Sequence, residues 1–239
     1  MSYKKINGIV IKEVAVGDAD KILTVLTGEE GRISVSAKNA KKIRSGIAAG
    51  TSFLSYNEFF LYKGKNTYIL NNTEIIESFY GLREDFTAFA YASYFAEILY
   101  YNIPENEPCK EIVRLFLNSL HFLTNAEKNK QLIKIIFELR TLCMLGYEPD
   151  VNNAEFGPED KDCFFSYDKC GIIKKSGGSC VKISKTELQI IRYIIGTDLK
   201  NAFSFNVSEE VLKTLAEISE TYLCERTERV YKSLKMVRE

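Results

Sequence analysis

The 239-residue chain lacks tryptophan, has a single histidine and carries no net charge. No uninterrupted apolar run approaches the roughly 20 residues that cross a bilayer. The N-terminal segment MSYKKINGIVIKE has no apolar core of the kind found in a secretory signal. These absences predict a cytoplasmic protein without a membrane span. In a reducing compartment, its six cysteines are expected to be free thiols or metal ligands rather than disulfides.

Sequence signals of a metal or catalytic centre are also missing. Cys163, Cys170 and Cys180 are too far apart to form the close C-x-x-C pairs of a structural zinc site, so free thiols are expected. The segment GIIKKSGGS at 171–179 does not have the Gly-Lys step of a phosphate-binding loop. His121 lies in a helical pattern with no nucleophile elbow nearby. The chain is therefore predicted to be a binding protein and not an enzyme, with a thiol hydrolase that pairs a cysteine with His121 as a weaker alternative.

Positive charge is concentrated in one segment near the N-terminus. The stretch from Gly31 to Asn57 contains no acidic residue. Its cations gather in SAKNAKKIRSG and are Lys38, Lys41, Lys42 and Arg44. Clustered lysine and arginine bind the closely spaced phosphates of nucleic acids by counterion release. The segment thus favours a nucleic-acid partner, and a solvated loop that keeps the protein soluble is the alternative.

Two further features bear on a nucleic-acid partner. Residues 1–80 carry a net positive charge and residues 81–160 a net negative one, which suggests a polyanion-facing first domain and a different partner for the next. Aromatic side chains on a barrel face can stack bases beside a basic groove. The candidates, most of which are expected to be core, are Phe53, Tyr56, Phe59, Phe60, Tyr62 and Tyr68.

The first 78 residues have the pattern of five β-strands. The apolar and alternating segments are INGIVIKEVAVG, KILTVLT, RISVSAK, TSFLSYNEFFLY and TYILNNTEIIES, separated by glycine-containing turns. Five short strands without a long intervening helix predict a small closed barrel of the oligonucleotide/oligosaccharide-binding (OB) type. We place a domain boundary near Gly81, which gives a barrel domain at 1–80 and a second domain at 81–239.

The period changes to that of helices after Asp85. DFTAFAYASYFAEILYYNI is apolar on nearly all sides, which implies burial against several neighbours. CKEIVRLFLNSLHFL and KNKQLIKIIFELRTLCMLG are two more helices, the second ending at Gly146. Two final helices are expected near residues 185–195 and 208–223, after a loop-rich segment at 147–180. The predicted fold class is therefore α+β, an OB barrel followed by an all-helical domain.

The ordered motifs of the chain resemble those of the bacterial DNA repair family RecO. In that family a first strand leads to an acidic turn, a hairpin and a basic loop. The matching residues here are Thr27, Gly31, Arg32, Ala37, Lys38, Lys41, Lys42, Arg44 and Ser45, with Asn39 in place of the usual glycine. FELRTLCMLGYEPDV is similar to the second family signature, and LAEISETYLCERTERVYKSLKMV to the closing one. The matches extend over almost the whole chain.

The resemblance implies a recombination mediator without cofactor or catalytic residues. Such a protein binds single- and double-stranded DNA, anneals complementary strands and works with RecR. It contacts the C-terminal tail of the single-stranded-DNA-binding protein and acts on RecA indirectly. The expected phosphate contacts are Lys38, Lys41, Lys42 and Arg44, with Lys21 and Arg32 as outer contributors. A protein–protein adaptor whose basic loop only aids solubility is the competing hypothesis.

One departure from the family pattern concerns zinc. Many members hold the metal with two C-x-x-C pairs after the LGY-x-P signature. The matching positions here are Ala154, Gly157, Lys174 and Gly177, none of which can ligate zinc. The segment at 147–180 is therefore expected to be a zinc-finger-like region that binds no metal.

Overall fold

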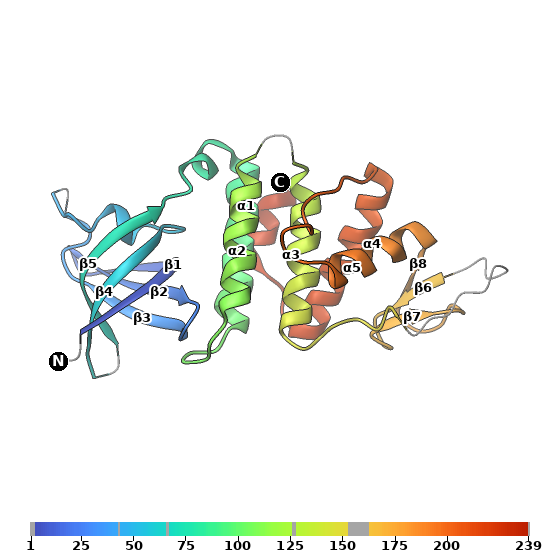
Figure 1. Cartoon of the computed structure of the whole chain (residues 1–239), viewed down its shortest axis with the longest axis horizontal. Coiled ribbons are helices and arrows are strands. Elements are labelled where there is room, and N and C mark those ends of the chain that lie inside the picture. Colours follow the sequence, from blue (N-terminus) through green and yellow to red (C-terminus); the bar gives the residue numbers. More distant parts are fainter. Residues whose placement is uncertain (1–2, 43, 66, 126–127, 153–162, 239) are drawn as a thin grey trace. The chain divides into compact units, whose positions relative to one another are not determined.

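The chain forms two compact units in a computed structural model that describes residues 3–42, 44–65, 67–125, 128–152 and 163–238. One unit comprises Met1–Thr124 with Lys232–Glu239, and the other comprises Asn125–Tyr231. The predicted boundary near Gly81 falls between the last barrel strand and the first long helix (Figure 1). A division into domains at that point stays a prediction.

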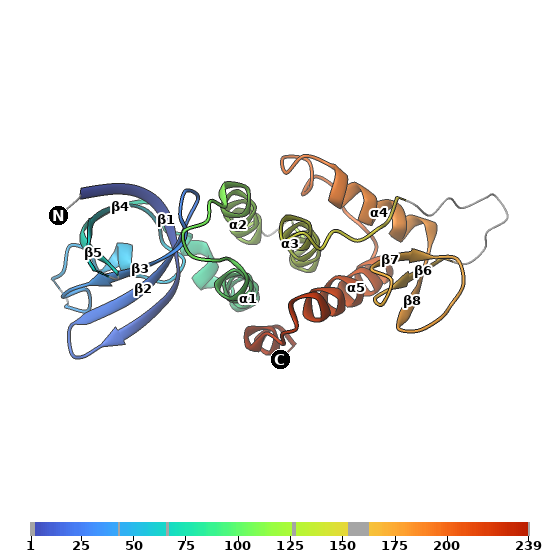
Figure 2. The ribbon, with the colours of Figure 1, turned by 90° about the horizontal axis from the view of Figure 1, so that it is seen from below.

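The N-terminal part is a closed five-stranded barrel, as predicted. Its strands are β1 (Tyr3–Val16), β2 (Asp20–Thr27), β3 (Gly31–Ala37), β4 (Tyr56–Lys63) and β5 (Tyr68–Glu77), with a short 3₁₀ turn, η1 (Ala49–Thr51), before β4. They close in the order β1-β2-β3-β5-β4, and β3 pairs in parallel with β5 while the other pairs are antiparallel. Figure 2 shows the strands curving around the barrel interior. This strand count and closed topology match the OB prediction.

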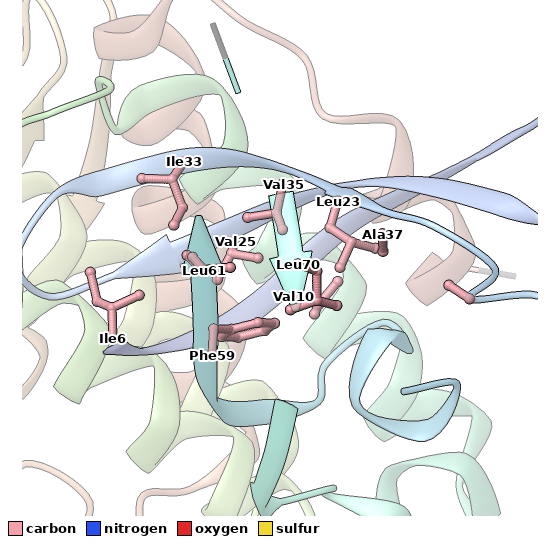
Figure 3. Packing of buried hydrophobic residues seen from close by; sticks show 11 residues of the cluster. Ile6, Val10, Leu23, Val25, Ile33, Val35, Ala37, Phe59, Leu61 and Leu70 are labelled. Atoms are coloured by element: carbon pink, nitrogen blue, oxygen red, sulfur yellow. The ribbon is translucent and has the colours of Figure 1, made fainter. Parts of the chain in front are cut away.

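Alternation along the strands determines which side chains fill the barrel. In β3 every second residue is buried, and Ile33, Val35 and Ala37 point inward. They pack with inward residues of the other strands, which Figure 3 shows at close range: Ile6, Val10, Leu23, Val25, Phe59, Leu61 and Leu70. Because side chains alternate with a period of two, the intervening residues of each strand lie on the outer face.

Helices complete the first unit. These elements are η2 (Tyr80–Glu84), α1 (Phe86–Asn102), α2 (Lys110–Leu123), η3 (Lys232–Leu234) and α6 (Lys235–Arg238). The side chain of Asp85 caps α1 by accepting a hydrogen bond from Ala88 N at 2.9 Å. Helix α1 contacts β1, α2, η2, η3 and α6. These neighbours surround it, which confirms the burial on several sides that its apolar sequence predicts.

The turn between β2 and β3 is bonded to the loop between α1 and α2. Arg32 N donates to Pro104 O at 3.2 Å, Asn106 N to Glu30 O at 2.9 Å, and Cys109 N to Gly28 O at 2.9 Å. The turn and the loop approach so closely that only a glycine fits at position 31. A Cβ atom there would lie 2.5 Å from Pro104 O, and the backbone φ of Gly31 is +60°.

We expect Gly31→Ala to lower the free energy of unfolding by roughly 2 kcal/mol or more, because a left-handed alanine costs about 1–2 kcal/mol and the contact with Pro104 O adds to it. Gly17→Ala is the matched control, since Gly17 has a φ of +57° but open space around it. Urea unfolding of both variants would measure the difference. Equal costs at the two positions would show that the close approach contributes nothing to stability.

The second unit contains three helices and a small sheet. Its elements are α3 (Lys130–Met144), β6 (Cys163–Ser166), β7 (Gly171–Ile173), β8 (Cys180–Ile183), α4 (Lys185–Gly196) and α5 (Glu209–Thr227). The helices match the predicted ones, and Gly146 follows α3 with a φ of +84°. The segment expected to be loop-rich also holds β6 and β7 of an antiparallel sheet of order β7-β6-β8, and β8 begins at the last residue of that segment. No helix of the described residues is long and apolar enough to cross a membrane.

Candidate nucleic-acid interface

The basic segment forms a loop that lies against the turn between β1 and β2. We define the basic loop as residues 38–46, of which residue 43 is not described. Its backbone is held by Lys41 N, which donates to Ala19 O at 2.9 Å, and by Asn39 N, which donates to Asp20 Oδ1 at 2.8 Å. Asn39 adopts a φ of 58°, a conformation that asparagine and glycine tolerate well. Asn39, which stands in place of the usual family glycine, thus adopts a left-handed backbone conformation that glycine also adopts readily.

Three cations of the basic loop face solvent without a counter-charge. Lys38, Lys42 and Arg44 are exposed, and among the described residues none has a carboxylate within salt-bridge distance. Lys41 is exposed too, but its Nζ donates to Gly17 O at 3.2 Å. Unpaired, solvated ammonium and guanidinium groups are the donors that phosphate oxygens bind. The basic loop therefore offers three available cations and one that already has a backbone partner.

The two expected outer contributors are placed differently from the loop. Lys21 pairs with Ala37 across β2 and β3, so it lies beside the loop, but its Nζ is 2.8 Å from Glu13 Oε2. Arg32 lies at the other end of β3, about 20 Å along the strand from Lys38 at ~3.3 Å per residue. Its Nε donates to Ile103 O. The roles of Lys21 and Arg32 in binding DNA stay predictions. Both side chains already have a partner in the protein, so they offer fewer available donors than the basic loop does.

Arg32 lies in a polar cleft of about 180 Å³ at that end of the barrel, together with Lys63, Lys65 and Tyr68. Tyr68 OH donates to Glu30 Oε2 at 2.8 Å, and the ammonium group of Lys4 donates to the same carboxylate. Partial burial alone would raise the pKa of Glu30, but these hydrogen bonds hold the pKa below its ordinary value. Glu30 is therefore ionised and already bonded near neutral pH, so it adds little free negative charge to the cleft.

The candidate aromatic residues divide between the core and the surface. Phe59 is fully buried, and Tyr68 packs against the barrel core. The ring of Phe53 contacts that of Phe89 in α1, with centroids 6.0 Å apart. Tyr56, Phe60 and Tyr62 alternate with buried neighbours in β4 and lie on its outer face. Tyr56 lines a pocket with Lys110 and Val113 of α2, whereas Phe60 and Tyr62 lie nearer the other end of the strand.

Two family models match the barrel and the helical part of the chain. The family model described as "Recombination protein O N terminal" matches residues 1–79, and the one described as "Recombination protein O C terminal" matches residues 83–235. The chain belongs to the RecO family. Its relatives include "DNA repair protein RecO" of Acetivibrio thermocellus, 38% identical over 100% of this chain and 97% of the relative. The proteins of that name from Symbiobacterium thermophilum and Clostridium novyi are 29% and 27% identical, covering 98% and 99% of this chain and 96% and 94% of the relatives.

Several residues of the RecO signature support the backbone and do not reach the solvent as ligands. Thr27 Oγ1 donates to Gly31 O at 3.0 Å and accepts from Glu30 N at 3.1 Å, which closes the turn before β3. Gly31 permits the approach of the α1–α2 loop. Thr27 and Gly31 of the RecO motif therefore have structural roles in the turn before β3. Lys38, Lys42 and Arg44 are exposed and form no ion pair among the described residues, so folding does not account for them.

Three of the six cysteines lack the lowered pKa of a nucleophile. All six are free thiols. Burial raises the pKa of Cys109 and Cys163 to about 11 and that of Cys143 to about 12. A nucleophilic cysteine needs a lowered pKa, and His121 is exposed on α2. These values weigh against Cys109, Cys143 and Cys163 as the nucleophile of the thiol hydrolase alternative.

Within the described ranges, no group of three or more His, Cys, Asp or Glu side chains could hold a metal ion. Of the positions that correspond to zinc ligands in RecO relatives, Ala154 and Gly157 lie outside the described residues. Lys174 and Gly177 follow β7, on an exposed turn. The absence of zinc stays a prediction that rests on the residue types at these positions.

Proposed function

We propose that this chain is a non-catalytic recombination mediator in DNA repair, which binds single- and double-stranded DNA through the basic loop and anneals complementary strands. The observation that carries the proposal is a set of exposed cations on an OB barrel, Lys38, Lys42 and Arg44, which form no ion pair within the part of the chain that the structure describes. Membership in the RecO family, whose relatives bear the name "DNA repair protein", supports it. We expect the protein to act in the cytoplasm.

Annealing follows from charge neutralisation at such a surface. Two complementary strands repel each other through their phosphates, and a shared cationic surface lowers this repulsion. Contacts to phosphate fix a strand in position without reading its sequence, so the base edges stay free to pair. No covalent step or nucleotide hydrolysis is needed.

The proposed partners follow from the RecO resemblance. With RecR, the protein would help RecA assemble on DNA that is coated by the single-stranded-DNA-binding protein, whose acidic C-terminal tail it would contact. In this proposal the chain does not bind or hydrolyse a nucleoside triphosphate while RecA assembles. Its part is to hold DNA and to dock other proteins.

Salt dependence tests the electrostatic part of the proposal. We expect log K for an oligonucleotide to fall linearly with log salt concentration, with a slope of about −0.7 for each single-strand phosphate neutralised. For the three available cations of the loop, this corresponds to a slope of about −2. Fluorescence anisotropy titrations at increasing salt would measure it. A salt-independent affinity would contradict the proposal, and no binding at any salt would favour the adaptor hypothesis.

A further inference from the structure

The outer face of β4 carries aromatic side chains at the positions that alternate with the barrel core. Phe59 and Leu61 point inward and are fully buried, so Phe60 and Tyr62 point outward. The neighbouring strand β1 places Tyr3 opposite Tyr62. A register shift of one residue would send these rings into the core, so the pairing of β1 with β4 fixes them on the surface.

These three residues, Tyr3, Phe60 and Tyr62, form an aromatic platform. The ring centroids of Tyr3 and Tyr62 are 5.6 Å apart and those of Tyr3 and Phe60 are 6.3 Å apart. Tyr3 is 52% exposed, and Phe60 and Tyr62 are half-buried. Cross-strand aromatic pairs stabilise sheets. This stabilisation alone does not require the rings to lie on the outer face. Here Tyr3 contacts both Phe60 and Tyr62 on the outside of the barrel, edge-on in the case of Tyr62, so the group offers aromatic surface to a ligand on that face.

The register of the strands connects the platform to the basic loop. Ser36 in β3 pairs with Ile69 in β5, and Ile69 pairs with Tyr62 in β4. Tyr62 is thus two strand spacings from Ser36, roughly 10 Å at 4.7–4.9 Å per spacing. Ser36 is followed two residues later by Lys38, the first residue of the basic loop. Figure 2 shows β4 and β1 as neighbours on the same side of the barrel.

Charges around the platform favour an anionic ligand at two of its borders. The basic loop lies beyond β5, and the exposed Lys63 and Lys65 lie at the end of β4 and just after it. The ammonium of Lys5 lies 5.3 Å from the centroid of the Phe60 ring and 2.7 Å from Glu58 Oε2. Carboxylates occur at the far end of the face, where Glu58 pairs with Glu74. A polyanion would therefore cross the platform between the basic loop and the β4–β5 loop and stay clear of this far end.

We propose that the aromatic platform stacks unpaired bases of a single DNA strand whose phosphates are held by the basic loop. The inference rests on the proposed function and adds a second, chemically different contact to it. Every base has a π-face, so stacking on tyrosine and phenylalanine is tolerant of sequence. Bases inside a duplex are already stacked on each other and cannot use the platform. The platform thereby gives the surface a preference for single strands, which the cations of the loop do not provide.

The test compares two strands of equal length and equal charge, an oligothymidylate and a fully abasic strand, by fluorescence anisotropy. The wild-type protein should bind the oligothymidylate at least about 5-fold more tightly, since stacking on one aromatic residue contributes about 1–3 kcal/mol. Tyr62→Ala with Tyr3→Ala should remove most of this preference and leave the affinity for the abasic strand and for duplex unchanged. Tyr62→Phe, which keeps the ring, should behave as the wild type.

Phe86→Ala is the matched control, because Phe86 is 65% exposed at the start of α1 and lies outside the platform. Thermal unfolding of each variant verifies that the barrel is intact. Equal binding of both strands by the wild type would overturn the platform and leave the basic loop as the DNA site. Binding of neither strand would overturn the proposed function together with the inference. A loss of preference in Phe86→Ala equal to that in the tyrosine variant would also refute the platform.

Discussion

Replacing Lys38, Lys42 and Arg44 together with glutamate is expected to lower the affinity for single-stranded DNA on the order of 100-fold and to abolish strand annealing. Each phosphate contact releases about 0.7 of a counterion, which near 0.1 M salt corresponds to roughly a 5-fold gain in affinity, and three such contacts multiply. The slope of log K against log salt concentration should become shallower by about 2. Lys41 stays unchanged in this variant, because its Nζ already donates to Gly17 O.

The measurement needs a control for net charge. Lys185, Lys200 and Lys213 are exposed in the second unit, and their replacement by glutamate changes the net charge by the same amount. This control should bind DNA almost as the wild type does, because the proposal assigns no phosphate contact to these three lysines. Equal losses in both triple variants would mean that overall charge and not the basic loop determines binding. An unchanged affinity in the loop variant would place the DNA site elsewhere.

The barrel could be predicted from the sequence because its signals are local. RISVSAK alternates with a period of two, and the structure buries Ile33, Val35 and Ala37 as that period requires. Helix α1 is apolar on all sides and contacts five other elements. The sequence does not predict the small sheet β7-β6-β8, since its strands have only three or four residues each and glycine and serine lie between β7 and β8. Such short segments carry too few alternations to show a period.

The candidate site could be predicted only in part. The density of cations in the basic loop is visible in the sequence, but the state of each cation depends on contacts with distant residues. Arg32 donates to Ile103 O, which is 71 positions away, and Lys21 pairs with Glu13 across a hairpin. The sequence likewise offers six aromatic candidates without saying which face outward. Pairing of β4 with β1 decides that Phe60 and Tyr62 do.

A buried ion pair between α3 and α5 gives the second large expected effect, on stability. Lys134 Nζ lies 2.9 Å from Glu138 Oε1 and 3.1 Å from Glu220 Oε2, and Ser219 Oγ donates to Glu138 Oε2 at 2.6 Å. Lys134 is 3% exposed and Glu138 is fully buried. Burial alone would lower the pKa of Lys134, but the two carboxylates raise it above its ordinary value. The lysine is therefore charged at neutral pH, and its contribution is lost only as the pH rises through this raised pKa.

We expect Lys134→Met to lower the free energy of unfolding by about 3–5 kcal/mol, because the buried carboxylate of Glu138 then loses the ammonium group that lies 2.9 Å from it. The cost should shrink as the pH is lowered, since a buried carboxylate without a cation has a raised pKa and is protonated more readily in the folded state. Urea unfolding at several pH values would measure both effects. Arg114→Met is the control: its pair with Glu111 is exposed at 3.6 Å and contributes about 0–1 kcal/mol.

The double variant Lys134→Met with Glu138→Met separates the charge from the packing. Removing both charges replaces the buried carboxylate on α3 with an apolar side chain of similar volume, while Glu220 of α5 is partly exposed to water, so the double variant should be more stable than Lys134→Met alone. Its recovery at neutral pH would show that the single variant is unstable because of an isolated carboxylate. If the double variant were instead less stable than Lys134→Met, the contacts of the lysine and glutamate chains, and not their charges, would hold the two helices together.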